Sequence, residues 1–206
     1  MFFNTFNRLL LTGEYYTANN KQVTASEVTQ IIRRQFASAD LSFVTNRNYG
    51  VDPNMIVVSG IYHSDDDKIE VILNYHPEQK IYRTRRLNWN QLSFDVAECA
   101  VHELIHREQH YSGKRYRRYR GTTEDQTYLG DEAEIDAYAF SIVANSLVSQ
   151  TPYQKCHVYK IYKKTFDKDP KVIVKLDKQI SKYFKRLEPD YEQNSNRDRT
   201  RVRRAV

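Results

Sequence analysis

The stretch NWNQLSFDVAECAVHELIHREQHYSG, residues 88–113, decides the fold, because the spacing of apolar residues changes here to that of a helix. The residues that recur at this spacing are Phe94, Ala97, Val101, Leu104 and Ile105. Ser93 is a residue type favoured at the start of a helix, and Gly113 is a type that commonly ends one. The sequence therefore predicts a long helix over 93–113 with one buried face.

Before this helix, several short stretches are rich in β-branched and aromatic residues, and turn sequences separate them. They are LSFVT (41–45), MIVVSGIYH (55–63), KIEVILNY (68–75) and KIYRTRRL (80–87). This pattern predicts three or four strands of a small, largely antiparallel sheet. The connection HSDDDK (63–68) is typical of a polar hairpin turn, although its three aspartates could also bind a cation.

Helices are predicted on both sides of these strands. TASEVTQIIRRQFASA (24–39) has an apolar stripe at helical spacing, and Thr24 with Glu27 has the spacing of a capping box. After the long helix, further helices are predicted over 130–149, 152–166 and 169–187. Apolar content then falls. We therefore expect one α+β domain over residues 1–188 and a basic, disordered tail over 189–206.

The composition is that of a globular protein, since 40% of the 206 residues are hydrophobic and 28% are charged. Two cysteines, Cys99 and Cys156, are too few for a disulfide framework. The N-terminal residues lack the features of a signal peptide, and no apolar run is long enough to span a membrane. We therefore expect an intracellular, cytoplasmic protein with free thiols.

The net charge of +6 is concentrated in two basic segments, GKRYRRYRG (113–121) and NRDRTRVRRAV (196–206). Both could contact an acidic partner or nucleic acid, and the tyrosines of the first could stack on the bases of a single strand. The simpler interpretation is a solvated loop and a solvated tail that keep the chain soluble. No membrane partner is expected.

Within the long helix, AVHELIHREQH (100–110) contains three of the chain's six histidines. Residues four apart lie one above the other on a helix, so His102 and His106 can both bind one ion at about 2.0–2.1 Å. Glu103 is turned about 100° from His102, so it can reach a water on the ion but cannot easily bind the ion. This H-E-x-x-H pattern therefore combines two metal ligands with a general base.

The alternative is an amphipathic helix with histidines on its surface. Leu104 and Ile105 favour the interpretation as a metal site, because apolar residues between the two histidines indicate a helix that packs in the protein core. His110 lies about 12 Å along the helix axis from His102, which is too far to share a tetrahedral site with both histidines. We expect His110 to support the other histidines or to be exposed.

A catalytic zinc site needs a third protein ligand, and GDEAEIDAYAFS (130–141) offers four acidic residues. Glu134 lies on a stripe of mostly small residues, which lets a second helix approach closely. A carboxylate placed there is costly unless a cation pairs with it, and zinc would supply that cation. Glu132 and Asp136 lie on other faces, where we expect solvent. Asp131 could accept the N–H of a ligand histidine.

HELIH (102–106) followed by a glutamate on a later helix resembles the zincin metallopeptidases, in the gluzincin branch, whose third ligand is glutamate. Within this branch, HELIHREQH (102–110) and EIDAYAF (134–140) are similar to the ImmA/IrrE-type peptidases. The motif of these peptidases is H-E-x-x-H-x-x-x-H and then E-x-x-A-x-x-F. The resemblance covers residues 98–145, about a quarter of the chain.

The resemblance implies a zincin-like fold, in which a small, mostly antiparallel sheet packs on the active-site helix and further helices follow. It also implies a zinc metalloendopeptidase with His102, His106 and Glu134 as ligands of Zn²⁺ and Glu103 as general base. Such an enzyme hydrolyses peptide bonds with a metal-activated water. An extended protein or peptide substrate would add to a sheet edge, at the strand predicted over 55–63 or 68–75.

The sequence departs from the family at one position. Many gluzincins have an aspartate four residues after the third ligand, where this chain has Tyr138. The residue that stabilises the oxyanion could be Tyr128, Tyr138 or His157.

Two other functions stay open. The protein could be associated with nucleic acid, as SprT-like peptidases are, although their third ligand is a histidine. It could also be a structural or assembly protein that keeps the zincin fold without turnover, although a purely structural site needs no base such as Glu103.

Overall fold

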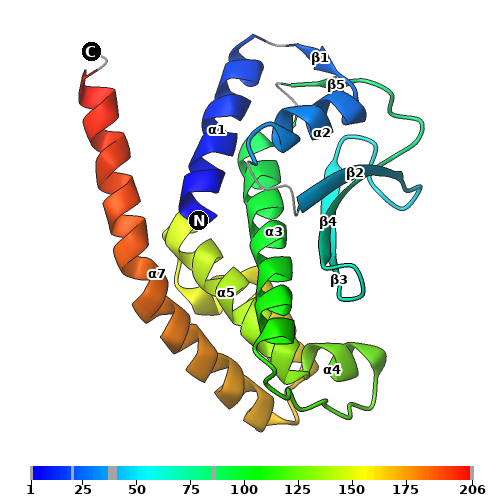
Figure 1. The fold of residues 1–206 in the computed structure, drawn as a ribbon, viewed down its shortest axis with the longest axis vertical. Coiled ribbons are helices and arrows are strands. Elements are labelled where there is room, and N and C mark those ends of the chain that lie inside the picture. The colour runs from blue at the N-terminus through cyan, green and yellow to red at the C-terminus, as the bar shows by residue number, and fades with distance from the viewer. Residues whose placement is uncertain (1, 20, 37–40, 85–86, 205–206) are drawn as a thin grey trace. The chain divides into compact units, whose positions relative to one another are not determined.

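The structure is a computed structural model that describes residues 2–19, 21–36, 41–84 and 87–204 (Figure 1). In chain order its elements are α1 (Phe2–Ala18), β1 (Gln22–Val23), α2 (Ala25–Arg33), β2 (Leu41–Arg47), β3 (Ile56–His63), β4 (Lys68–Tyr75), β5 (Tyr82–Arg83), α3 (Trp89–Tyr111), α4 (Glu124–Leu129), α5 (Glu132–Ser149), η1 (Tyr153–Lys155), α6 (His157–Thr165) and α7 (Pro170–Arg204). The protein therefore has the α+β fold that the sequence predicts. No helix among the described residues has both the length and the apolar character needed to cross a membrane.

Contacts between Cα atoms divide the chain into two compact units, residues 1–107 and 108–206. The boundary falls inside α3, so this helix begins in the first unit and ends in the second. Each unit is described separately below. A single domain over residues 1–188 stays a prediction.

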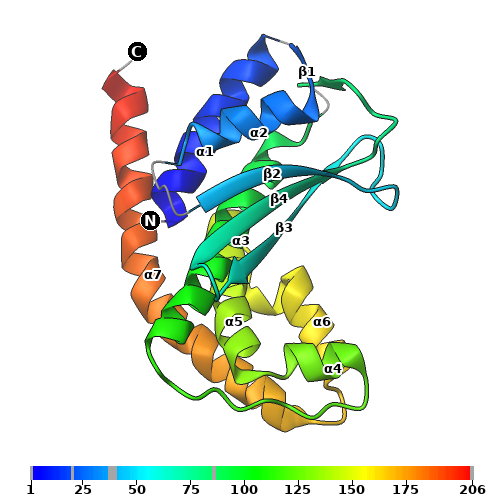
Figure 2. The same ribbon diagram turned by 45° about the vertical axis from the view of Figure 1, so that its right-hand side comes forward.

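The larger sheet of the first unit has the strand order β2–β4–β3 (Figure 2). β3 and β4 are antiparallel, whereas β2 runs parallel to β4, so that Val71 pairs with Gly60 on one side and with Phe43 on the other. β4 lies in the centre of the sheet, where the neighbouring elements shield its apolar residues from water. Ile69, Val71 and Leu73 are fully buried. β4 therefore has no open edge. Of the two strands predicted to receive a substrate, β3 alone has an open side among the described strands.

The described residues of the segment 80–87 do not join this sheet as a fourth strand. Among them, Tyr82–Arg83 form β5, which pairs with β1 in a separate antiparallel sheet, with Tyr82 opposite Val23. Residues 85–86 of the segment lie outside the described residues. The Thr84 hydroxyl donates a hydrogen bond to the carbonyl oxygen of Tyr16 at 2.8 Å. Side-chain composition thus indicated an extended segment, but packing next to α1 decided its pairing.

The N-terminal residues form α1, which the sequence analysis did not predict. Phe3, Phe6 and Leu9 recur at helical spacing and are buried. Gly13 lies directly against α3, because a Cβ atom at this position would be 2.8 Å from the Cβ of Trp89. Glycine therefore permits the close approach of α1 to α3.

α3 begins at Trp89, about one turn before the predicted start at Ser93. Asn88 caps the helix, since its Oδ1 accepts the N–H of Gln91 at 3.2 Å. Ser93 lies inside the helix and is 2% exposed. Asn and Ser are both favoured caps, so residue type alone could not choose between them. At the other end Gly113 has a φ of +63°, which agrees with the predicted stop.

α2 begins with the predicted capping box. Thr24 Oγ1 accepts the N–H of Glu27 at 3.2 Å, and the N–H of Thr24 donates to Glu27 Oε2 at 2.7 Å. The helix ends at Arg33, earlier than predicted, and the ring of Phe36 then lies 4.7 Å from that of Phe43. Residues 37–39, the end of the predicted helix, lie outside the described residues.

The turn between β3 and β4 is the predicted polar hairpin. Asp66 pairs with Lys68 at 2.9 Å. Asp67 accepts two hydrogen bonds from the guanidinium of Arg107 on α3, at 2.8 and 2.9 Å. These aspartates therefore pair with cationic side chains of the protein.

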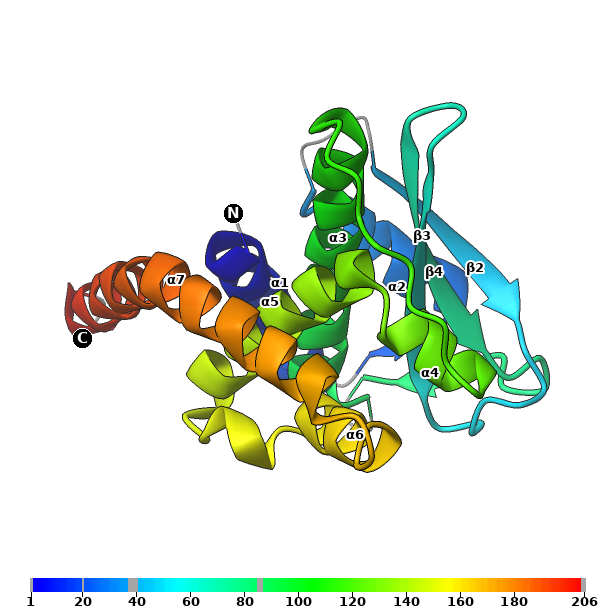
Figure 3. The same cartoon turned by 90° about the horizontal axis from the view of Figure 1, so that it is seen from below.

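In the second unit, α5 packs against α7 (Figure 3). The residues of α5 that are fully buried are Ile135, Ala137, Ala139, Ile142, Val143 and Ala144. The Phe140 ring meets that of Tyr183 on α7 at 5.8 Å between centroids. α4 is a short helix within the segment predicted as a long connection, and Thr123 caps it by accepting the N–H of Gln126 at 3.1 Å.

α7 begins at Pro170, as predicted, and continues to Arg204. The backbone of residues 189–204, which the sequence analysis expected to be disordered, is therefore helical. Five of the sixteen residues in this segment are arginines, which favour helices, and the packed part of α7 supplies the nucleus that an isolated tail would lack. Residues 205–206 and the side chains of the basic segment 196–206 lie outside the described part of the chain.

Candidate metal centre

α3 brings the imidazoles of His102 and His106 together, as their four-residue spacing predicts. Their Nε2 atoms are 3.2 Å apart, and the ring planes are inclined by 70°. Two nitrogens that each lie about 2.05 Å from one zinc ion, at a tetrahedral angle, would be about 3.3 Å apart. The histidines therefore have the separation of two ligands to one ion.

A carboxylate on the preceding turn of α3 lies near the buried His102. Glu98 Oε1 is 4.0 Å from His102 Nδ1, which is too long for a hydrogen bond. The carboxylate therefore lies on the Nδ1 side of the imidazole, away from the Nε2 atom that faces His106. Asp131 was the residue predicted as the partner of a ligand histidine, and Glu98 was not considered, although Glu98 and His102 have the four-residue spacing of neighbours on a helix face.

Glu103 is buried at 8% exposure, and β3 lies directly over it. A Cβ atom on Gly60 would be 3.0 Å from Glu103 Oε1 and 2.5 Å from Cys99 Sγ. A residue without a side chain is therefore needed at position 60. Burial raises the pKa of the Cys99 thiol, and the charges of Glu98 and Glu103 add to this effect. Cys99 is thus a neutral thiol at neutral pH and not a thiolate ligand.

Asp131, Glu132 and Asp136, three of the acidic residues near the start of α5, are held by contacts within the second unit. Asp131 accepts the backbone N–H of Tyr119 at 2.6 Å, Glu132 pairs with Lys175 at 2.8 Å, and Asp136 accepts from Gln109 at 3.4 Å. Glu132 and Asp136 are therefore half-buried and paired, where the sequence analysis expected solvent. The hydrogen bond from Lys175 is the largest cause that lowers the pKa of Glu132.

Glu134, the fourth acidic residue, forms a group with His102 and His106. Each of the three side chains offers one ligand atom, and these atoms lie within 4.8 Å of one another. The group could therefore hold a metal ion, and its members are the three residues that the sequence predicts as ligands. Among the described residues, no second cluster of His, Cys, Asp and Glu side chains has this property. His110 is exposed and does not belong to the group.

Tyrosines from three helices lie near Glu134 in the second unit. Burial, then the Glu134 carboxylate and Tyr138, raise the pKa of Tyr128. Burial, Tyr138 and Glu134 likewise raise the pKa of Tyr162. At neutral pH these phenols are therefore neutral groups that can donate hydrogen bonds. Among the predicted oxyanion candidates, Tyr128 and Tyr138 lie near Glu134, whereas His157 is exposed at the first position of α6.

The three tyrosines near Glu134 were not predicted to lie together. Tyr128 belongs to α4, Tyr138 to α5 and Tyr162 to α6, and the rings of Tyr138 and Tyr162 are 5.9 Å apart. No local spacing brings three helices together, so the cluster had no signal in the sequence beyond the high tyrosine content.

Known proteins assign no family to this chain. No model of a protein family, no curated protein and no solved structure matches it. Its function therefore has to be argued from the residues of the site and their geometry.

Proposed function

We propose that this protein is a zinc-dependent metallopeptidase with His102, His106 and Glu134 as its metal ligands. The group of three ligand atoms within 4.8 Å of one another is the observation that carries the proposal. Two imidazoles and one carboxylate suit zinc, and three protein ligands leave a position for water. The resemblance of HELIH (102–106) and Glu134 to the gluzincins implies the same ligand set.

When bound to these ligands, zinc would lower the pKa of a water molecule and polarise the carbonyl of a substrate. In this proposal the Glu103 carboxylate takes a proton from that water and later gives it to the leaving amine. The close approach of Gly60 limits the positions that this carboxylate can occupy. Tyr128 is our candidate for donating a hydrogen bond to the oxyanion, because its phenol is neutral and lies beside Glu134.

The substrate in this proposal is an extended peptide bound along β3. Among the described strands β3 pairs with β4 alone, so one of its sides is open. Peptides that add to a sheet edge are held by main-chain hydrogen bonds, while pockets for alternate side chains provide specificity. Binding at β3 would place the peptide on the strand that lies over Glu103.

Elemental analysis of the purified protein tests the ligand set. We expect about one zinc ion per chain in the wild type and in Glu103→Gln, and a large loss in Glu134→Ala, because only the last variant removes a ligand. Glu132→Ala is the matched control, since it removes an acidic residue from the same turn of α5 and should keep the metal. A wild type that binds no zinc after zinc is added would contradict the proposal.

Peptide hydrolysis then distinguishes a peptidase from a protein that binds zinc without turnover. A peptide library incubated with the zinc-loaded protein and analysed by mass spectrometry would show the cleaved bonds. We expect Glu103→Gln to reduce the rate about a hundredfold or more while it keeps zinc, because general acid–base catalysis typically contributes that much. Equal cleavage by the wild type and Glu103→Gln would exclude Glu103 as the base.

A further inference from the structure

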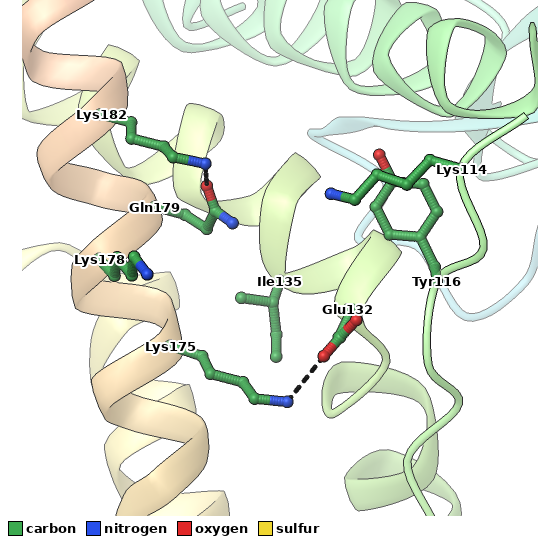
Figure 4. Close-up of a pocket in the computed structure, with 8 residues that line it drawn as sticks. All are labelled: Lys114, Tyr116, Glu132, Ile135, Lys175, Lys178, Gln179 and Lys182. Carbon is green, nitrogen blue, oxygen red and sulfur yellow. Dashed lines mark hydrogen bonds and ion pairs between the residues drawn. The ribbon is translucent and has the colours of Figure 1, made fainter. Parts of the chain in front are cut away.

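A hollow of about 210 Å³ in the second unit lies between the basic segment 113–121 and α7 (Figure 4). The residues that line it are Lys114, Tyr116, Glu132, Ile135, Lys175, Lys178, Gln179 and Lys182. Four of these eight residues are lysines, and one is acidic. The lining therefore has a net charge of about +3 at neutral pH.

The lysines are not neutralised by the lining itself. Lys175 pairs with the single acidic residue, with 2.8 Å between its Nζ and Glu132 Oε1. Lys182 donates to the neutral amide oxygen of Gln179 at 2.9 Å. The Nζ of Lys114 lies 4.6 Å from the centroid of the Tyr116 ring. Lys175 is thus the one lysine of the described lining that is paired with a lining carboxylate.

The basic charge comes from two segments about sixty residues apart in the sequence. On α7, Lys171, Lys175, Lys178 and Lys182 are spaced by four, three and four residues, and so share one face. Figure 4 shows Lys175 and Lys182 extending from α7 toward Ile135, with Lys114 on the opposite side of the hollow. Like charges gathered in this way repel one another, and a bound anion would offset that repulsion.

We infer that this hollow binds a short chain of phosphate groups. Several ammonium groups on opposite walls match a ligand with negative charge at more than one point, and lysine binds phosphate as a compact point charge. A hollow of about 210 Å³ is smaller than the 300–1,000 Å³ typical of sites for drug-sized ligands, so it suits two or three phosphate groups. The Lys114 ammonium covers a face of Tyr116 that a base would need for stacking, which favours bare phosphates over a nucleic acid.

The anion site does not depend on the proposed peptidase function. Glu132 lines the hollow, while Glu134 belongs to the metal-ligand group. Two positions along a helix correspond to a rotation of about 200°, so the two carboxylates leave α5 on nearly opposite faces. The phosphate site would therefore remain even if the protein bound no zinc.

Calorimetric titration of the full chain with inorganic tripolyphosphate at low ionic strength tests this inference. We expect Lys178→Gln/Lys182→Gln to weaken binding about tenfold, because two charge contacts are lost. The matched control is Lys163→Gln/Lys164→Gln on α6, which removes the same charge from exposed lysines outside the hollow. This control should bind within about twofold of the wild type.

A gain in affinity provides a second, independent test. Glu132→Gln removes the only carboxylate of the lining and releases Lys175, so we expect it to bind tripolyphosphate several-fold more tightly. Glu124→Gln, on the exposed surface of α4, makes the same charge change elsewhere and should have little effect. Lysine acylation mapped by mass spectrometry should show tripolyphosphate protecting Lys175, Lys178 and Lys182 but not Lys163 or Lys164.

Several results would overturn the inference. They are no binding by the wild type, equal weakening in the two double-lysine variants, or displacement of tripolyphosphate by polyglutamate at the same charge concentration. Binding of single-stranded DNA that requires Lys178 and Lys182, without binding of tripolyphosphate, would also overturn it and would assign the surface to a nucleic-acid backbone.

Discussion

Gly60 on β3 faces Glu103 on α3, and a Cβ atom at position 60 would be 2.8 Å from Glu103 Cγ. Real contacts of a Cβ are longer than this, so any side chain here must displace either the strand or the carboxylate. At the residue scale, the position of the proposed base Glu103 therefore depends on glycine, which has no side chain, at position 60 of β3.

We expect Gly60→Ala to reduce peptide hydrolysis about a hundredfold, because a displacement of about 1 Å in a reacting group can cost that much. Zinc content should not change, since His102, His106 and Glu134 remain. The added methyl group should also lower the free energy of unfolding by about 1–3 kcal/mol. Rate, metal content and urea unfolding are the three measurements.

Gly50→Ala is the control for this substitution. Gly50 is exposed, and the one atom within 4 Å of an added Cβ would be Asn48 Oδ1 at 3.2 Å. Gly50→Ala should retain the wild-type rate of peptide hydrolysis. A Gly60→Ala protein with full activity would show that Glu103 tolerates the displacement or is not the base.

Single elements of this fold are stabilised by local contacts that the sequence already indicates. The capping box of α2 is the clearest example: the backbone N–H groups of Thr24 and Glu27 are both satisfied by side chains. Hydrogen bonds from the backbone and side chain of Thr24 lower the pKa of Glu27 from its ordinary value of 4.5. At the element scale, the start of α2 is therefore sensitive to pH.

We expect Thr24→Ala to lower the free energy of unfolding by about 1 kcal/mol at pH 7, as the loss of a helix cap usually does. Thr24→Ala removes the hydroxyl, which accepts the N–H of Glu27 and also donates to the Glu27 carboxylate, but it keeps the backbone N–H at position 24. The folded-state pKa of Glu27 lies below its unfolded value, so the part of the stabilisation that comes from its carboxylate is complete above pH 4.5 and is lost as the pH falls through the folded-state pKa. Urea unfolding at a series of pH values should thus show the difference between the two proteins becoming smaller in acid.

Thr24→Ser should behave like the wild type, because serine also accepts the N–H of the third helical residue. If Thr24→Ala and the wild type differed by the same amount at every pH, the bond to the Glu27 carboxylate would not be the cause.

The candidate metal ligands come from parts of the chain that are distant in sequence, since Glu134 lies 28 positions after His106. An unfolded chain does not hold these groups together, so zinc that requires all three binds the folded state. At the scale of the whole molecule, zinc should therefore stabilise the fold.

We expect zinc at about 100 times its Kd to stabilise the wild type by about 2.7 kcal/mol. For a chain of this size, that corresponds to a rise in Tm of about 5–10 °C. A chelator should reverse the shift, and magnesium, which prefers oxygen ligands, should not reproduce it. An equal shift in Glu134→Ala would mean that zinc stabilises the protein from another site.

By itself, the sequence determined the features that depend on neighbours along the chain. The four-residue spacing of His102 and His106 predicted that their imidazoles meet on one helix face, and their Nε2 atoms lie 3.2 Å apart. The capping box of α2 and the bounds of β4 were also predicted, because each depends on a local pattern of residue types.

The tertiary structure alone decided which distant segments meet. It paired β5 with β1, placed Gly60 over Glu103, and brought the lysines of α7 to the basic segment 113–121. It also placed Ser93 inside α3 and made Asn88 the cap. The physical reason is that these arrangements follow from packing and from the satisfaction of buried polar groups by residues far apart in the chain, and no local period in a sequence encodes such contacts.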